Sequence, residues 1–295
     1  MHLSNLIYQI ILPIKDRIQS NRIINYYENL SESRDKDLVE MINYIKKVRQ
    51  VRALNYPFAE KYKNMSVKIG WDKLENRFYC CHKNKKMYFS STFRSRKEAA
   101  ECYRLIAAEQ DKDSPHRYLS KTFRVDNGSI VVDAGVAEGN FSIEVLPYAE
   151  KLILVESDPA WIEALKVTFR DEIRAGKVVF VEKFLGEHDD EHTITLDTLY
   201  KKYGKIDFVK MDIEGSEQAA LRGAKRMLAD SKMLKMAVCT YHTPEAFIEV
   251  CNILGGGNFE LRHTRRYMVL NPILGWKAPY ARRGIVRAVK KDNRR

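Results

Sequence analysis

Apolar runs and amphipathic stretches alternate along the chain from residue 121 onward. Five of the runs are rich in Val, Ile, Leu and Met, and each has the length of a buried strand: SIVVDA, KLILVES, KVVFVEK, IDFVKMD and LKMAVCTY. Residues with helical periodicity follow them, at 139–149, 159–175, 195–203, 215–230 and 244–254. Strands interleaved with helices predict a parallel sheet with helices on both faces.

Two further apolar runs, NFELRHT and RYMVLNP, follow the last predicted helix. The gap between them is too short for a helix, so the pair predicts an antiparallel hairpin. A parallel sheet that ends in an antiparallel hairpin resembles the Rossmann-like fold of the class I methyltransferases. On this basis we expect residues 116–275 to form one α/β domain.

Residues 1–115 follow a different pattern, which predicts a smaller α+β region ahead of the sheet. A helix is expected at residues 3–14, where Pro13 would bend or end it, and a charge-rich helix at residues 35–54. Short aromatic and β-branched runs at residues 66–90 predict a small β-meander.

A strong helix signal closes this N-terminal region. Ser95 and Glu98 have the spacing of a capping box at the start of the stretch SRKEAAECYRLIAAEQ. The polar segment DKDSPHRY follows and contains a proline. We expect the boundary between the two regions in this segment, near residue 115.

The composition of the 295-residue chain excludes several classes of protein. Hydrophobic residues make up 45% and charged residues 31%, which allows a sizeable core beneath a polar surface. No apolar run reaches the roughly 18 residues of a membrane span, and the first residues lack the features of a secretory signal. Five cysteines without a CxxC pair predict reduced thiols in a cytoplasmic protein.

The net charge of +12 is concentrated in the last part of the sequence. Residues 277–295 contain eight Lys or Arg and one Asp, a net charge of +7. The expected basic tail, residues 276–295, is either a disordered solubilising end or a segment attracted to phosphate-bearing acceptors or to anionic lipid at the inner face of a membrane. Because most of the positive charge lies in this tail, no nucleic-acid partner is expected. The oligomeric state stays open.

The stretch VVDAGVAEGNFS, residues 131–142, joins the first predicted strand to the first helix. Gly135 and Gly139 would let the backbone approach a ligand without an intervening Cβ. The strand ends in Asp133, a carboxylate that would repel a phosphate but suits an ammonium group. The second strand ends in Glu156, where it would accept hydrogen bonds from ribose hydroxyls. S-adenosylmethionine has an ammonium and a ribose but no phosphate, so it fits this loop better than NAD.

The predicted cofactor-binding residues cover this loop and the ends of three strands. They are Asp133, Ala134, Gly135, Glu138, Gly139, Asn140, Phe141, Glu156, Ser157 and Asp212. A simpler interpretation is an ordinary strand-to-helix turn in which Glu138 and Asn140 start the helix. The acid at the end of the second strand and the order of the elements favour the cofactor.

Residues 195–224, TLDTLYKKYGKIDFVKMDIEGSEQAALRGA, resemble the FkbM family of S-adenosylmethionine-dependent methyltransferases. The similarity lies in the segments TLD, IDF, KMDIEGSE and LRG. The loop after the first strand is also similar to the family's D-V-G-A-N-x-G, except that Ala137 stands where the family usually has Asn. The resemblance covers about residues 116–270. It implies O-methylation, often of a sugar hydroxyl in a glycan or glycoconjugate, without identifying the acceptor.

Three acids stand close together after the fourth predicted strand. Asp212 ends the strand, Glu214 comes next, Gly215 permits a sharp turn, and Glu217 falls in the first turn of the following helix. Asp212 and Glu214 are candidates for a general base or for the ligands of a divalent cation. The alternative is that Glu214 and Glu217 only cap the helix, as Asp197 would cap another.

His242 ends the fifth predicted strand at the same edge of the sheet. An imidazole has a pKa suited to taking a proton from a hydroxyl, so His242 joins Asp212 and Glu214 as a catalytic candidate. His116, beside the expected domain boundary, ranks behind it. The sequence leaves metal-assisted and metal-free transfer open.

Two other functions stay open at this stage. One is methylation of a nucleic acid, although the chain lacks an N-P-P-Y type of motif and does not interleave basic and aromatic residues. The other is a non-catalytic module that binds S-adenosylmethionine, or binds a partner through residues 1–115. The acids at positions 133, 156, 212 and 214 favour an active enzyme over such a module.

Overall fold

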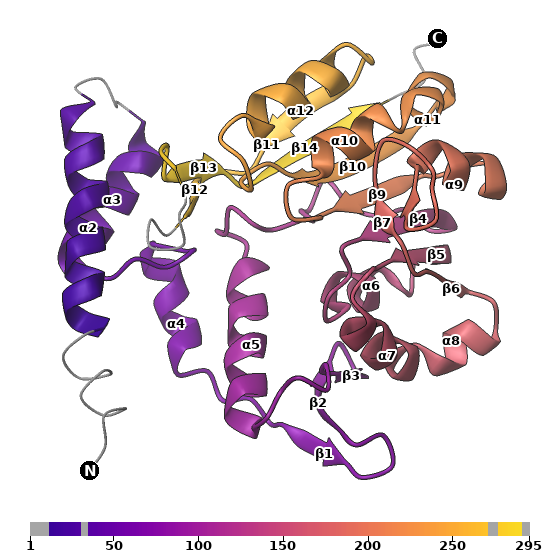
Figure 1. The fold of residues 1–295 in the computed structure, drawn as a ribbon, viewed down its shortest axis with the longest axis horizontal. Helices are drawn as coiled ribbons and strands as arrows, with labels where there is room; N and C mark the ends of the chain where they lie inside the picture. The colour runs from indigo at the N-terminus through magenta and orange to yellow at the C-terminus, as the bar shows by residue number, and fades with distance from the viewer. Residues whose placement is uncertain (1–11, 31–34, 271–276, 291–295) are drawn as a thin grey trace.

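A seven-stranded sheet forms the centre of the protein. The computed structural model describes residues 12–30, 35–270 and 277–290. The strand order is β11-β14-β10-β9-β4-β5-β6 (Figure 1). Five neighbouring strands are parallel: β4 (Ser129–Ala134), β5 (Ala149–Val155), β6 (Val178–Val181), β9 (Phe208–Met211) and β10 (Leu234–Cys239). They coincide with the five apolar runs, and the predicted parallel sheet is therefore confirmed.

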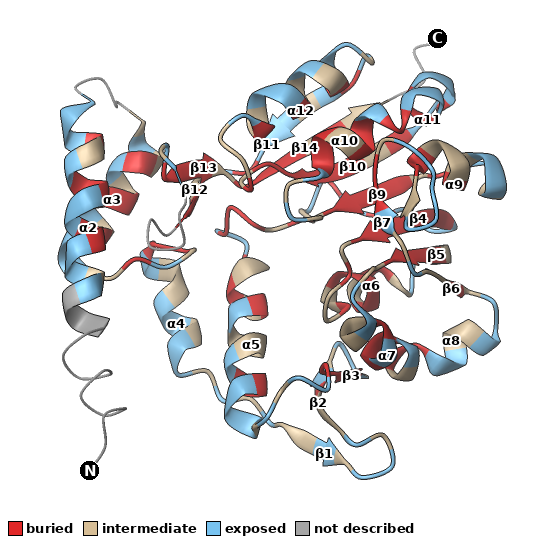
Figure 2. Ribbon diagram, viewed as in Figure 1, coloured by how far each residue is buried: buried red, intermediate tan, exposed pale blue. Residues whose placement is uncertain are grey.

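Helices cover both faces of this sheet because every central strand is apolar on both sides. Val132, Val209 and Val238 contribute to one core, whereas their neighbours Val131, Phe208 and Ala237 contribute to the other. The first core is completed by α9 (Leu196–Tyr203), α10 (Glu217–Arg222), α11 (Lys225–Asp230) and α12 (Ala246–Gly255). The second is completed by α5 (Arg96–Glu109), α6 (Asn140–Val145) and α7 (Pro159–Thr168), which continues into α8 (Arg170–Arg174). Figure 2 shows the sheet as the most deeply buried layer.

The antiparallel edge of the sheet differs in part from the prediction. β11 (Glu260–His263) pairs antiparallel with β14 (Ile285–Lys290), which lies between β10 and β11. β12 (Tyr267–Val269) was expected to be the partner of β11, but it pairs with β13 (Ala281–Arg283) in a separate ribbon. The antiparallel pair of the class I fold is thus present, with the β12–β13 ribbon inserted between its two strands.

The expected basic tail is also corrected, because residues 285–290 form a strand of the central sheet. Two of its cations are used inside the fold. The Arg287 guanidinium donates to the backbone carbonyls of residues 117, 118 and 119, and the Lys290 ammonium donates to those of residues 228 and 229. Residues 291–295 lie outside the described residues, and contact with a membrane surface stays a prediction.

The N-terminal elements are a pair of helices, a short helical segment and a three-stranded meander. They are α2 (Leu12–Asn29), α3 (Lys36–Val48), η2 (Pro57–Ala59), α4 (Glu60–Lys63), β1 (Gly70–Asp72), β2 (Arg77–His82) and β3 (Lys85–Tyr88). The antiparallel meander, α3 and α5 confirm three predictions. Ser95 caps α5 by accepting from the Glu98 N–H at 3.1 Å. α2 was not predicted beyond residue 14; Pro13 falls inside it, and the predicted helical residues 3–11 lie outside the described residues.

Two contacts attach these N-terminal elements to the sheet. The β12–β13 ribbon packs against α2 and α3, which stand at the left of Figure 1. β3 packs against α7, where the Tyr88 N–H donates to Thr168 Oγ1 at 3.1 Å. The meander and α5 therefore share the second core with the sheet. Of the helices in the described parts of the chain, none has the length and apolar character needed to span a membrane.

Candidate functional site

The carboxyl ends of β4, β5 and β9 border a cavity of about 380 Å³. Ligands of open parallel sheets bind at such an edge, where the chain leaves neighbouring strands in opposite directions. The cavity is lined by Gly135, Ala137, Val155, Glu156, Ser157, Asp158, Trp161, Lys183, Phe184, Leu185, Asp212, Ile213, Glu214 and Ser216. It includes four of the residues predicted to bind a cofactor: Gly135, Glu156, Ser157 and Asp212.

The loop after β4 passes so close to β9 that only glycine fits at its first position. A Cβ on Gly135 would lie 1.7 Å from the Asp212 carbonyl oxygen, and the φ of Gly135 is +69°. Gly139 precedes α6 with a φ of +80°, and a Cβ there would lie 2.8 Å from Leu165. Both glycines are thus required by the close approach of backbone to its neighbours. Ala137, between them, also has a left-handed φ of 47°.

Glu156 fixes the loop to the end of β5. One carboxylate oxygen accepts hydrogen bonds from the N–H groups of Val136 and Ala137, both at 3.0 Å. The other oxygen accepts from Ser157 at 2.8 Å and from Asp158 at 3.0 Å. The side chain is half-buried in the cavity wall. Glu156 therefore shapes the cavity through backbone amides in addition to facing it.

Asp133 does not line the cavity. Its carboxylate is fully buried, lies 3.0 Å from the Lys210 ammonium and accepts from Ser142 Oγ at 2.6 Å. Lys210, on β9, also donates to the carbonyls of Ala134 and Gly135. Burial raises the pKa of Asp133 although Lys210 and Ser142 act in the opposite direction. Through Lys210, Asp133 is therefore linked to the backbone of the Gly135 loop. Its expected contact with a cofactor ammonium stays a prediction.

The other predicted loop residues lie behind the cavity. The Glu138 carboxylate accepts a hydrogen bond from Cys102 Sγ at 3.1 Å, and burial raises its pKa. Asn140 begins α6, and the Phe141 ring is buried 5.7 Å from that of Tyr118. Ala134 is the buried last residue of β4. These residues support the loop, and their direct contact with a cofactor stays a prediction.

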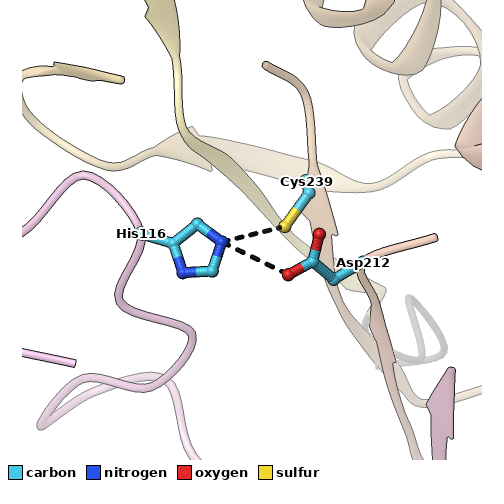
Figure 3. Close-up of side chains that lie close together, drawn as sticks. All are labelled: His116, Asp212 and Cys239. Atoms are coloured by element: carbon cyan, nitrogen blue, oxygen red, sulfur yellow. Dashed lines mark hydrogen bonds and ion pairs between the residues drawn. The ribbon is translucent and has the colours of Figure 1, made fainter. Parts of the chain in front are cut away.

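Asp212 is surrounded by four hydrogen-bonding groups. One of its oxygens lies 2.7 Å from the Tyr118 hydroxyl and 3.3 Å from His116 Nε2, while the other lies 3.4 Å from both the Tyr241 hydroxyl and His242 Nε2. Figure 3 shows His116, Asp212 and the buried thiol of Cys239 converging from three segments. Burial would raise the pKa of Asp212, but His116, Lys210 and His242 outweigh it and hold that pKa well below its usual range.

Each of the two histidines also has a carboxylate next to its second nitrogen. His242 Nδ1 lies 2.9 Å from Glu217 Oε1, and His116 Nδ1 lies 3.9 Å from Glu109 Oε2. Burial alone would lower the pKa of both imidazoles, but these acids and Asp212 raise the pKa of each above its usual value. Burial raises the pKa of Glu109 to about 7. Two imidazoles of raised basicity therefore present Nε2 to the same aspartate.

The three predicted catalytic residues are brought together by these contacts. Besides its contact with Asp212, His242 Nε2 lies 3.6 Å from Glu214 Oε2. Glu214 is 89% exposed and has a left-handed φ of 55°, followed by Gly215 at 98°. Two successive residues with positive φ make the sharp turn that separates the exposed Glu214 from the buried Glu217.

Comparisons with known proteins identify the family of the chain. The family model described as Methyltransferase FkbM domain matches residues 81–272, more than half of the chain. The chain belongs to the FkbM methyltransferase family.

Three of the solved structures that are similar to the chain are an FkbM methyltransferase and two fibrillarins. The FkbM methyltransferase from Methylobacillus flagellatus KT is 17% identical with a TM-score of 0.47; the alignment covers 66% of this chain and only 56% of that one. The fibrillarin of Aeropyrum pernix, solved with natively bound S-adenosyl-L-methionine, is 14% identical with a TM-score of 0.39 and coverages of 76% and 98%. Methanococcus jannaschii fibrillarin is 12% identical with a TM-score of 0.42 and coverages of 77% and 99%. No curated protein sequence matches the chain.

The donor groups of this FkbM methyltransferase do not support the expected cation pair. In the described part of the chain, two sets of side chains converge closely enough to share an ion, and the ligand atoms within each set lie within 4.8 Å of one another. The sets are His116 with Asp212 and Cys239, and Asp212 with Glu217 and His242. Glu214 belongs to neither set, and cation binding by Asp212 and Glu214 stays a prediction.

Several residues at the site were not predicted from the sequence. Trp161 and Phe184 reach the cavity from α7 and from β7 (Phe184–Leu185), which pairs with β8 (Thr193–Ile194). Tyr118 contacts Asp212 from a loop, and Lys210 contacts Asp133 from β9. Asp197, within the family-like segment, caps α11 by accepting from the backbone N–H groups of residues 226 and 227. The buried pair Asp133–Lys210 had one signal in the sequence, which is the lysine within the apolar run IDFVKMD. A buried charge requires a partner.

Proposed function

We propose that this FkbM methyltransferase transfers a methyl group from S-adenosylmethionine to a hydroxyl oxygen of a saccharide. The observation that carries the proposal is the position of His242. Its Nε2 lies 3.4 Å from Asp212 and 3.6 Å from Glu214, and its Nδ1 lies 2.9 Å from Glu217. Asp212 and Glu214 line the cavity, and His242 lies directly behind them. A hydroxyl is a weak nucleophile, and an imidazole backed by a carboxylate is a suitable group to take its proton.

The cavity has features that suit S-adenosylmethionine. Gly135 keeps one wall free of side chain, and the half-buried carboxylate of Glu156 lies where ribose hydroxyls would approach. Trp161 and Phe184 offer aromatic surface to an adenine ring. When bound, the cofactor supplies a methyl group on a sulfonium leaving group, so the protein has mainly to align the acceptor oxygen.

The protein's own residues divide the remaining tasks. His242 receives the proton of the acceptor hydroxyl at Nε2. Glu217 orients the imidazole through Nδ1 and stabilises its protonated form. Asp212, whose lowered pKa keeps it ionised, faces the same Nε2 at 3.4 Å and holds His116 on its other side. No metal is required for these steps, and we propose metal-free transfer.

The test is methyl transfer from radiolabelled S-adenosylmethionine to a panel of saccharides, with and without EDTA. We expect a labelled methyl ether on a saccharide, a rate unaffected by the chelator, and a loss of about 10²- to 10⁴-fold in kcat for His242→Ala. His188→Ala is a matched control, because His188 is an exposed histidine that lines a different pocket, away from Asp212 and Glu217. Methylation of RNA but of no saccharide would overturn the proposal, and normal turnover of His242→Ala would remove the proposed base.

A further inference from the structure

A second cavity, of about 680 Å³, lies beside the end of α6 and the residues that precede β4. Four cationic side chains line it: Lys83, Arg117, Lys121 and Arg124. Its two acids do not balance them. Asp126 is already ion-paired with Lys235 at 2.7 Å, which leaves Glu144 as the remaining carboxylate of the lining. The cavity therefore carries a net positive charge and would attract an anion.

The cations of this cavity differ in how firmly they are held. The Arg117 guanidinium is half-buried and donates to the carbonyls of Leu119 and Gln110, both at 2.7 Å. Such bonds fix the side chain but leave its charge in place. Lys83, Lys121 and Arg124 are exposed, and none of them forms an ion pair with a carboxylate of the described residues. These three are free to turn toward a ligand.

The rest of the lining is apolar enough to receive more than a simple ion. Leu119, Ile143, Val145 and Pro147 contribute aliphatic surface, and Tyr148 contributes a ring although its residue is 49% exposed. An exposed aromatic ring beside cations is a surface on which the C–H face of a sugar packs while its anionic group meets the charges. The combination favours a charged saccharide over inorganic phosphate.

The segment from residue 116 to residue 119 starts beside the proposed methyl-transfer site and leads toward this cavity, which borders the amino ends of β4 and β5. His116 and Tyr118 turn their buried side chains toward Asp212, at 3.3 and 2.7 Å, whereas Arg117 and Leu119 line the cationic cavity. Arg287 holds the backbone of the segment from β14. Alternate residues of one short stretch thus serve two sites.

We propose that the cationic cavity binds an anionic sugar unit of the acceptor, such as a uronate or a sugar phosphate, as an anchoring subsite. The proposal rests on the proposed function, since it adds a charged unit to the saccharide acceptor. It assigns Lys121 and Arg124 to charge recognition and Tyr148 to packing against the sugar.

The experiment is calorimetric titration of the full chain, at low ionic strength, with glucuronate, glucose 6-phosphate and glucose. Inorganic phosphate and vesicles containing phosphatidylserine are titrated in the same way. We expect the two anionic sugars to bind at least about tenfold more tightly than glucose. Lys121→Gln and Arg124→Gln should each weaken the anionic sugars by about tenfold, as expected for loss of a charge-assisted contact. Lys47→Gln, an exposed lysine of α3 outside the lining, should change nothing. Binding of S-adenosylhomocysteine by each variant verifies that the fold is intact.

Four results would overturn the proposal. They are equal affinity for glucose and the anionic sugars, unchanged affinity in both charge variants, inorganic phosphate binding as tightly as glucose 6-phosphate, and binding confined to vesicles containing phosphatidylserine. The last would assign the cavity to a membrane surface. Because the titration needs no turnover, methyl transfer to a neutral saccharide combined with no anion binding would remove the subsite and leave the proposed function standing.

Discussion

Nδ1 of His242 lies 2.9 Å from Oε1 of Glu217, and both side chains are buried. The same carboxylate oxygen accepts a hydrogen bond from the Ile213 N–H at 2.9 Å, so Glu217 is fixed at the start of α10. The imidazole is thereby held in one orientation, with Nε2 toward Asp212. The sequence left Glu217 either as a helix-capping acid or as a member of an acid cluster, and its contact with Nδ1 makes it a candidate positioning residue for the proposed base.

We expect Glu217→Gln to change the pH dependence of methyl transfer. Glu217 raises the pKa of His242, so the imidazole is deprotonated, and active as a base, only above its ordinary pKa of 6.5. Removing the charge should shift the acidic limb of the pH–rate profile to lower pH and reduce kcat by about tenfold or more. Glutamine keeps the acceptor for Ile213, which preserves the fold. If the acidic limb lies at the same pH in both proteins, the group that titrates in this limb is not His242.

The same pair predicts how stability changes with pH. Because the pKa of His242 is raised in the folded state, its stabilising contribution is complete below the unfolded value of 6.5 and is lost as the pH rises through the folded pKa. The stability difference between the native protein and Glu217→Gln should therefore be largest, at about 3 kcal/mol, in acid and shrink toward alkaline pH. Urea unfolding from pH 5.5 to 9 measures it, and a constant difference would contradict the pairing.

Asp133→Ala should act mainly on stability. It would leave the buried Lys210 ammonium without its partner, which costs about 3–5 kcal/mol. Asp133→Ala combined with Lys210→Met should recover much of this loss, because no uncompensated charge remains. Denaturant unfolding and titration with S-adenosylhomocysteine separate the two roles. A mutant that loses cofactor affinity but no stability would favour direct contact instead.

Ala137→Asn should stabilise the protein by roughly 0.5–1 kcal/mol. Ala137 has a left-handed φ of 47°, a conformation that asparagine adopts more readily than alanine. The family that the loop resembles usually has Asn at this position, and the left-handed backbone suits that residue. Thermal unfolding should show a rise of about 2 °C. A fall would mean that the asparagine side chain clashes with its surroundings.

Trp161→Ala should weaken the binding of S-adenosylhomocysteine by about tenfold or more, as expected when a base loses an aromatic stacking partner. Trp71→Ala is the matched control, because Trp71 is on β1 and outside the cavity lining. If both variants bind S-adenosylhomocysteine with equal affinity, the adenine does not stack on Trp161.

The sequence was sufficient to predict those elements whose own residues determine whether they are buried. β4 and β9 were predicted because long apolar runs have to be buried on both faces of a sheet. The close approach of the backbone at Gly135 was predicted because a glycine has no Cβ to clash with its neighbours. β14 was missed because Arg287 and Lys290 made its sequence look like a solvated basic tail. Their hydrogen-bond partners are backbone carbonyls far away in the sequence, which no local pattern indicates. Trp161, Tyr118 and Glu109 reach the site only through tertiary packing, so no local pattern indicated them.

The insertion of β14 between β10 and β11 has a consequence for biosynthesis. Residues 285–290 follow every other strand in the described chain, yet they fill a gap inside the sheet. Until they leave the ribosome, the facing edges of β10 and β11 both carry unpaired N–H and C=O groups, which invite strands from other chains. The nascent protein therefore stays vulnerable to misassembly after its candidate catalytic residues have been translated.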